Sequence, residues 1–268
     1  MRWLRAQPDQ QSTVRDNYFD LPVQAAAERY CASEEFGGVV ALIGEGGGRS
    51  ILDLGAGNGI VSYSLARHGW RVTAVEPDPS AEIGAGAIRG LADGGGLTVS
   101  VIEGRLPLSV AGESFDGVVC REVLHHLDDL PGAMRELARL LRPGGFLLAW
   151  REPVVDDAGQ LAQFLESHPL HHKYGGENAF SLGQYVHAIE AAGLRVSRKL
   201  GHLETIINFY PGSEQQRREL LRWSVRRSLG GAGRVLSALP GMAAFLERRV
   251  IARNRSPGRL VTLLAFKP

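Results

Sequence analysis

The sequence predicts an α/β fold built on a doubly wound parallel sheet, and three observations predict it. Seven short apolar segments of strand length are separated by segments with helical periodicity. That alternation is typical of a parallel sheet covered by helices on both faces. A chain of 268 residues with 44% hydrophobic side chains can bury one large core. A glycine-rich loop also joins the first strand to the helix after it.

The strands are predicted where apolar and β-branched residues cluster between turn residues. In chain order they cover residues 50–54, 72–75, 97–102, 115–120, 146–150, 194–200 and 260–266. The intervening helices cover 22–43 in two pieces, 60–68, 80–92, 131–142 and 181–192. Pro131 suits the first turn of its helix. Ser181 suits an N-cap, and Gly193 ends the same helix.

Two parts of the chain fall outside this alternation. Residues 1–20 are polar, so we expect them to be poorly ordered without a ligand, and we assign 1–30 as an N-terminal segment and lid helix. About 55 residues separate the last two strands, whereas loops seldom exceed about 15 residues. Because their pattern is mostly helical, we predict a basic helical insertion over 201–257. The core then comprises 31–200 together with 258–268.

Composition and charge exclude several classes of protein. No apolar run reaches the roughly 18 residues of a membrane-spanning helix, and the first residues lack the apolar core of a cleaved signal. Cys31 and Cys120 cannot form a disulfide framework, so we expect a cytoplasmic location. Residues 201–268 carry 11 Arg and 1 Lys against 4 Glu, in a chain of net charge +1. This basic quarter is either a solvated face or a contact for an anionic partner.

The glycine-rich loop carries the strongest chemical signal. It reads DLGAGNG over residues 53–59. Glycines let a ligand approach the backbone, and the helix that follows offers free N–H groups. The spacing differs from the G-x-G-x-x-G of dinucleotide sites, and Asp53 would repel a pyrophosphate but suits an ammonium group and hydroxyls. Glu76, at the end of the second strand, can accept both hydroxyls of a ribose.

Four motifs stand in a fixed order: ILDLGAGNG at 51–59, VTAVEPD at 72–78, SFDGVVCREVLHHL at 114–127 and LLRPGGFLL at 140–148. Together they resemble the class I S-adenosylmethionine (SAM)-dependent methyltransferases that act on small molecules. The resemblance covers about residues 30–200 and resumes at 260–268. It implies a seven-stranded, mostly parallel sheet whose last strand is antiparallel and lies between strands five and six, with the helical insertion before that strand.

The resemblance also implies SAM as the cofactor and a set of residues that bind it. Asp53 and the glycine loop would hold its methionine end, and Glu76 would bind its ribose. Residues near Glu103 would flank the adenine, where Gly104-Arg105 departs from the acid and small residue of many relatives. Arg121 would lie beside the sulfonium or form a local ion pair. The implied binding residues are Asp53, Gly55, Ala56, Gly57, Gly59, Glu76, Pro77, Glu103, Gly104, Arg105 and Arg121.

Histidines are the candidates for acting on a hydroxyl acceptor, which must lose a proton during methyl transfer. His125 and His126 follow the fourth strand, and His172 lies in HPLHHKYGGEN at 168–178, which we expect to overhang the acceptor. Paired histidines are also common packing and capping residues. We predict no metal site, because neighbouring side chains such as His171 and His172 diverge and the nearby acids lack a recognised ligand spacing.

The predicted function is therefore SAM-dependent methyl transfer to a small-molecule, glycan or lipid-type acceptor, most readily at oxygen. The alternative is a module that binds SAM, or has lost it, and transfers no methyl group. Three roles are open to the insertion: a cap on the acceptor pocket, a peripheral contact with an anionic membrane, or nucleic-acid binding. Nucleic acid is the least favoured, because RNA recognition usually needs several exposed aromatic rings and Trp223 stands alone among the arginines. The sequence does not predict the oligomeric state.

Overall fold

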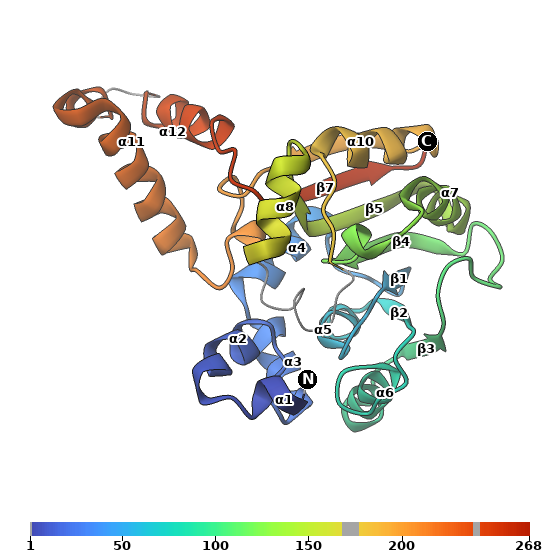
Figure 1. The fold of residues 1–268 in the computed structure, drawn as a ribbon. Helices are drawn as coiled ribbons and strands as arrows, with labels where there is room; N and C mark the ends of the chain where they lie inside the picture. Colours follow the sequence, from blue (N-terminus) through green and yellow to red (C-terminus); the bar gives the residue numbers. More distant parts are fainter. Residues whose placement is uncertain (1, 168–176, 238–241) are drawn as a thin grey trace.

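A computed structural model describes residues 2–167, 177–237 and 242–268, without the side chains of 228–237 and Ala243. A twisted sheet forms the centre of the molecule, helices cover its two faces, and a pair of helices projects to one side (Figure 1). The layers are those of the predicted α/β fold.

The sheet has seven strands in the order β3-β2-β1-β4-β5-β7-β6. Strands β1 to β5 pair in parallel, whereas β7 lies antiparallel between β5 and β6, as predicted. Strand β5 extends beyond the predicted 146–150 at both ends, because Leu141 pairs with Phe115 of β4 and residues 152–154 pair with β7. The strands are β1 (Ser50–Leu54), β2 (Arg71–Glu76), β3 (Val99–Glu103), β4 (Phe115–Arg121), β5 (Leu141–Val154), β6 (Arg195–Leu200) and β7 (Arg259–Phe266).

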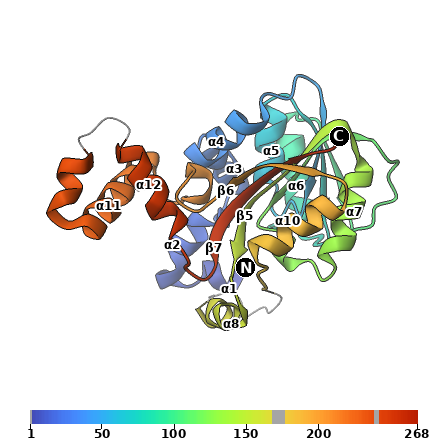
Figure 2. The same cartoon turned by 90° about the horizontal axis from the view of Figure 1, so that it is seen from above.

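The helices separate into two layers, one on each face of the sheet (Figure 2). One layer holds α3 (Val23–Cys31), α4 (Glu34–Ile43), α5 (Ile60–Arg67) and α6 (Ala85–Gly95). The other holds α7 (Leu130–Leu140) and α10 (Leu182–Ala191). Helix α8 (Ala158–Ser167) follows β5, and a 3₁₀ turn, η2 (Leu124–His126), follows β4. The predicted helix over 22–43 indeed forms two pieces.

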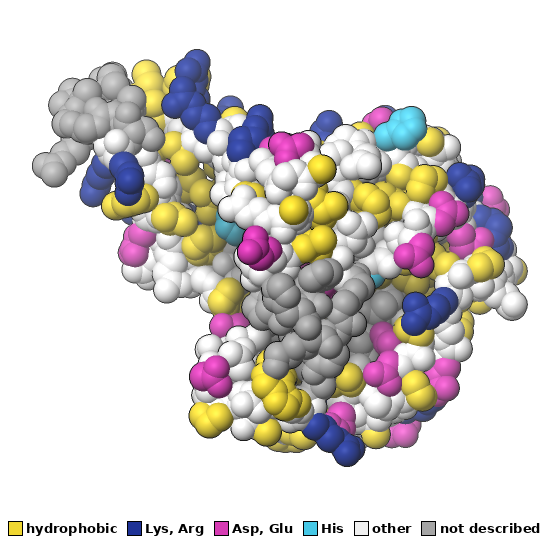
Figure 3. All heavy atoms as spheres, viewed as in Figure 1, with side chains coloured by type: hydrophobic (Ala, Val, Ile, Leu, Met, Phe, Trp, Pro, Cys, Tyr) yellow, Lys and Arg dark blue, Asp and Glu magenta, His cyan; other side chains and the backbone are white. Residues whose placement is uncertain are grey.

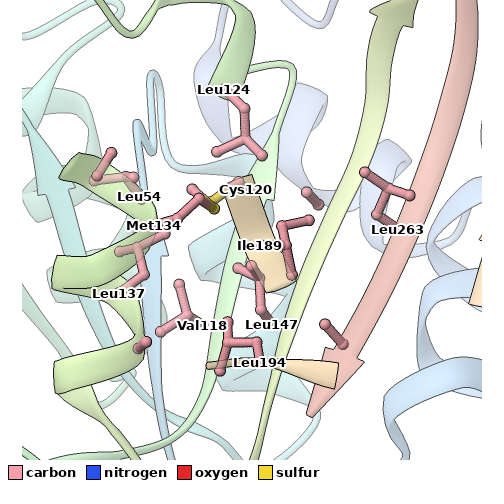
Figure 4. Packing of buried hydrophobic residues seen from close by; sticks show 14 of the residues in the cluster. Leu54, Val118, Cys120, Leu124, Met134, Leu137, Leu147, Ile189, Leu194 and Leu263 are labelled. Carbon is pink, nitrogen blue, oxygen red and sulfur yellow. The ribbon is translucent and has the colours of Figure 1, made fainter. Parts of the chain in front are cut away.

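Packing under α7 and α10 holds the central strands in place (Figure 4). Cys120 of β4 and Leu147 of β5 are fully buried, beside Met134 of α7 and Ile189 of α10. Burying one such side chain is worth roughly 1.5–3 kcal/mol relative to exposing it. This packing fixes the positions of the central strands, and therefore of their carboxyl ends, where the site lies.

The N-terminal residues adopt helices, so the expectation of poor order over 1–20 is wrong. Helices α1 (Arg2–Arg5) and α2 (Gln11–Asp16) are joined by a 3₁₀ turn, η1 (Pro8–Gln10). Tyr18 is completely buried, edge-on to Tyr30 and stacked on Tyr210. Its carbonyl accepts a hydrogen bond from Asn58 Nδ2 at 2.6 Å, which ties this segment to the glycine loop. These partners come from distant parts of the chain and leave no local pattern.

The insertion before β7 has two parts. A 3₁₀ turn, η3 (Ile206–Asn208), packs on the body next to α4. Helices α11 (Glu214–Ser237) and α12 (Met242–Ala252) then pack on each other and project away from the sheet (Figures 1 and 2). We call these two helices the arm. Within the described ranges, no helix combines the length and the apolar character that crossing a membrane requires.

Candidate functional site

Most of the residues selected from the sequence converge where β1, β2, β4 and β5 end. Two cavities open there, a small cavity of about 290 Å³ and a large cavity of about 840 Å³. Gly55, Glu122 and His126 line both, so the two spaces meet beside the glycine loop. The volume of the large cavity lies within the range usual for small-molecule sites.

The glycine loop needs its glycines for two separate reasons. Gly55 and Gly57 have φ angles of 66° and 55°, in the left-handed region that favours glycine. A Cβ atom on Gly55 would also lie 2.7 Å from a methyl group of Val123. A Cβ on Gly57 would meet no atom within 4 Å. Since Gly57 lines the small cavity, it leaves the space beside the backbone open to a ligand.

Glu76 is held by backbone N–H groups at both of its oxygens. Oε2 accepts from Gly57 N at 2.8 Å, and Oε1 accepts from Asp78 N at 2.9 Å. The residue lines the large cavity beside Pro77. A carboxylate oxygen has two lone pairs, so each retains capacity for a further donor. The geometry therefore suits recognition of two neighbouring hydroxyl groups.

Asp53 is almost fully buried and lines the small cavity. Its Oδ2 accepts a hydrogen bond from Ser62 Oγ at 2.6 Å. Burial, together with the nearby charge of Glu76, raises the pKa of Asp53 to about 7, although the Ser62 hydrogen bond opposes the rise. A cationic ligand in the small cavity would stabilise its ionised form.

Arg121 belongs to a compact charge cluster with Glu35, Glu122 and Arg151. Its Nε lies 2.8 Å from Glu35 Oε1, and its Nη1 lies 2.7 Å from Glu122 Oε2. The second oxygen of Glu122 receives Arg151 Nε at 2.8 Å. Burial alone would raise the pKa of Glu122, but the two arginines lower it to about 2. The local ion pair predicted as one alternative for Arg121 is present, and Arg121 also lines the small cavity.

The backbone is strained at this cluster. Glu122 and Arg151 have φ angles of 56° and 60°, which are uncommon for residues other than glycine. Both side chains line the small cavity, and each holds the other through their ion pair. Such strain concentrates at functional sites, where the surrounding structure keeps side chains in fixed positions.

His125 is held between two carboxylates. Its Nδ1 lies 2.8 Å from Glu152 Oε2, and its Nε2 lies 3.6 Å from Glu177 Oε2. Glu152 is fully buried and also accepts the backbone N–H groups of residues 123–125. Burial alone would lower the pKa of His125, but the two carboxylates raise it to about 9. The ring of His126 contacts the ring of His125 at a tilt of 41°, with 4.0 Å between the ring centroids.

The structure brings most of the sequence-predicted residues to the cavities. Asp53, Gly55, Ala56, Gly57, Arg121, His125 and His126 line the small cavity. Gly55, Glu76, Pro77, Gly104, Arg105 and His126 line the large one. Gly59 instead caps α5, and Glu103 pairs with Arg89 on the surface and lines neither cavity. His172 lies outside the described residues.

Sequence reasoning missed other residues of the small cavity and its walls. They are Asn17, Phe19, Glu35, Arg151 and Glu152. Two of them could have been predicted from the sequence. Arg151 and Glu152 directly follow the apolar segment 146–150, and residues after such a strand lie at the ligand-binding edge of the sheet. Glu35 instead resembles an ordinary acid in the first turn of a helix, after the cap Ser33.

Part of the chain matches known proteins in sequence. Residues 52–149 match the family model described as a methyltransferase domain. A ubiquinone biosynthesis O-methyltransferase of Aeromonas salmonicida is 35% identical over 98 residues, which are 37% of this chain and 41% of that protein. The chain thus matches about two fifths of the length of this curated relative.

Solved structures share the fold over most of the chain. Geranyl diphosphate C-methyltransferase from Streptomyces coelicolor A3(2) superposes with a TM-score of 0.61 at 15% identity, covering 100% of this chain and 90% of that one. The [4+2]-cyclase SpnF superposes with a TM-score of 0.58 at 21% identity, covering 91% and 82%. At these identities the likeness establishes the fold alone. The cyclase also shows that the fold is not confined to proteins named as methyltransferases.

Proposed function

Because residues 52–149 match the family model of a methyltransferase domain, we propose that the chain transfers a methyl group from SAM to an oxygen of a small-molecule acceptor. One observation carries the proposal. The glycine loop, Glu76 and the end of β4 surround two cavities that meet at Gly55, so a cofactor site and an acceptor site would adjoin. The name of the curated relative supports oxygen as the methylated atom.

The cofactor's parts fit the lining residues by their chemistry. The large cavity offers Glu76 for the ribose hydroxyls and Pro77, Gly104 and Arg105 around the base. The small cavity offers Asp53 for the ammonium group, and the open backbone at Gly57 allows close approach. When bound, SAM supplies a methyl group on a positively charged sulfur, which makes the methyl carbon electrophilic.

The protein's part in the reaction is to position the acceptor oxygen beside the methyl group. The small cavity is lined by Asp53 and Gly57 on one side and by His125 and His126 on another. An acceptor oxygen in this cavity would therefore lie between the cofactor's methyl group and the histidine pair. Glu152 is a positioning residue, since its hydrogen bond fixes the orientation of the His125 ring.

The arm serves a different purpose in this proposal, because none of its described residues lines either cavity. We propose that it contacts an anionic membrane surface. Residues 214–255 hold ten Arg and three Glu. Trp223 and Phe245 are 53% and 51% exposed, with the guanidinium groups of Arg227 and Arg249 over their rings. Basic and apolar side chains lie together on the arm (Figure 3), as in helices that bind at membrane interfaces.

Calorimetric titration with SAM and with S-adenosylhomocysteine tests the cofactor, and turnover with a panel of phenols and sugars tests the transfer. Binding of both compounds followed by methylation of a hydroxyl supports the proposal. Binding without turnover of SAM favours the non-catalytic module. Co-sedimentation with anionic vesicles tests the arm, with Trp223→Ala/Phe245→Ala expected to weaken binding and Trp3→Ala as the control at another exposed tryptophan. Equal binding of the double variant would contradict the membrane contact.

A further inference from the structure

Three side chains with metal-binding atoms meet at one wall of the small cavity. His125, His126 and Glu177 each offer one such atom, and all three atoms lie within 4.8 Å of one another. All three residues line the small cavity. Two of them are adjacent in the chain, where side chains on a regular helix or strand would diverge. The 3₁₀ turn η2 instead brings their rings together, with 4.0 Å between the centroids.

The hydrogen bonds of His125 fix which of its nitrogens faces the cavity. Nδ1 is engaged by the buried Glu152 at 2.8 Å, so Nε2 points the other way, toward Glu177. A carboxylate behind the imidazole is the usual support of a metal-binding histidine, since it fixes the ring and makes Nε2 a better ligand. Glu152 is itself held by three backbone N–H groups, which leaves this support little freedom.

The spacing of the ligand atoms also suits one ion. His125 Nε2 and Glu177 Oε2 are 3.6 Å apart, which exceeds the usual length of a hydrogen bond. Two ligands bound at about 2.1 Å to a tetrahedral ion are separated by about 3.4 Å. The pair therefore needs only a small adjustment to share an ion.

We propose that His125, His126 and Glu177 bind one divalent transition-metal ion, with Zn²⁺ as the representative species. Two imidazoles and one carboxylate suit such ions better than Mg²⁺ or Ca²⁺, which prefer oxygen ligands. Three protein ligands leave one coordination position for a water molecule or substrate, as in catalytic zinc sites. The site faces the same cavity as Asp53 and Gly57, so this position would be open to the acceptor.

The role of the ion rests on the proposed function, whereas its binding does not. A hydroxyl oxygen at the open position would release its proton to solvent water more readily, because the ion stabilises the oxyanion. That oxygen would then form the O–CH3 bond as the S–CH3 bond breaks, and the sulfonium would leave as a neutral thioether. The ion would not change its oxidation state.

Metal titration of the full chain tests the site directly. Protein dialysed against a chelator would be titrated with Zn²⁺ in competition with a chromogenic indicator, and with Co²⁺ to record its visible absorption. We expect one ion per chain. His126→Gln and Glu177→Gln should weaken binding by about 100-fold or more, and Glu152→Gln by about 10–100-fold. His187→Gln, at an exposed histidine on α10, should leave binding unchanged.

Two results would overturn the metal site. One is no stoichiometric uptake of either ion near neutral pH by the wild-type chain. The other is uptake that persists in both His126→Gln and Glu177→Gln, which would place the ion elsewhere. SAM titration of the same samples keeps the two proposals apart. SAM binding and turnover without metal uptake would reject the metal site and support the proposed methyl transfer. Metal uptake without SAM binding would support the metal site and reject the proposed methyl transfer.

Discussion

The carboxylate of Glu76 accepts a hydrogen bond from the backbone N–H of Gly57, with 2.8 Å between Oε2 and N. The acid at the end of β2 and the glycine loop after β1 therefore form one unit. Asp78 N donates to the other oxygen, so the carboxylate is orientated before any ligand arrives. The glycine loop and Glu76 were selected separately from the sequence. The hydrogen bond that joins them could not be predicted from either motif.

Replacing Glu76 with Gln should weaken SAM binding by roughly 100-fold. The amide must turn its NH2 toward either Gly57 N or Asp78 N, which are both donors, and it loses the charge that strengthens bonds to the ribose hydroxyls. Hydrogen bonds to charged groups are worth about 1.5–3 kcal/mol each. Calorimetry would measure the loss. Glu103→Gln is the matched control, because Glu103 is the register partner of Glu76 on β3 yet lines neither cavity. Equal loss in both variants would contradict this assignment.

The fold and the cofactor side of the site could be predicted because their signals are local. Each strand is a short apolar run, and the loop from Asp53 to Gly59 has a composition that few other structures require. Strand β5 was predicted too short because Arg151 and Glu152 are charged. Both are buried in the structure, where each finds partners of opposite charge or backbone donors.

The acceptor side could be predicted only in part, because its contacts join distant segments. His125 was selected from its place after β4, but Glu152 and Glu177 reach it from 27 and 52 positions along the chain. Glu35 meets Arg121 across 86 positions. Spacing in the sequence gives no sign of such pairs. The prediction against a metal site was argued from His171 and His172, which lie outside the described residues, and from the spacing of nearby acids. It did not weigh His125 and His126, whose rings the 3₁₀ turn brings together.

Asp53 should make the stability of the protein depend on pH. Its pKa is about 7 in the folded chain against an ordinary value of 3.8, so the folded state holds its proton more tightly than the unfolded state. Stability from this group is therefore greatest at low pH and falls as the pH rises from about 4 to about 7. The total is on the order of 4 kcal/mol.

Asp53→Asn removes this titration while keeping the shape of the side chain. We expect the unfolding free energy of the variant, relative to wild type, to increase between pH 4 and 7 and to level off above. Denaturant unfolding at several pH values would measure it, with Ser62→Ala as a second variant that removes the stabilising hydrogen bond. A difference independent of pH would show that Asp53 has an ordinary pKa. SAM binding by wild type should strengthen over the same pH interval, because the ammonium group favours ionised Asp53.

Removing Arg151 and Glu122 together should destabilise the protein less than removing Arg151 alone. Arg151→Met leaves Glu122 and Glu35 short of positive charge in a buried place, and breaking such a pair costs about 3–5 kcal/mol. Arg151→Met/Glu122→Gln removes one charge of each sign, so it should recover much of that stability. Unfolding of wild type, both single variants and the double variant gives the coupling energy. Additive effects would mean that the two side chains do not stabilise each other.

Gly55 and Gly57 should respond differently to alanine although both have positive φ. A left-handed conformation costs a non-glycine residue about 1–2 kcal/mol, so both variants should lose that much stability. Gly57→Ala adds no clash, so it should fold and lose mainly cofactor affinity, because its methyl group enters the space beside the small cavity. Gly55→Ala also places its Cβ 2.7 Å from Val123, so it should be the less stable of the two. Val123→Ala should rescue Gly55→Ala and leave Gly57→Ala unimproved. Thermal unfolding with SAM titration separates the effects, and rescue of both variants alike would mean that the clash at Val123 is not the cause.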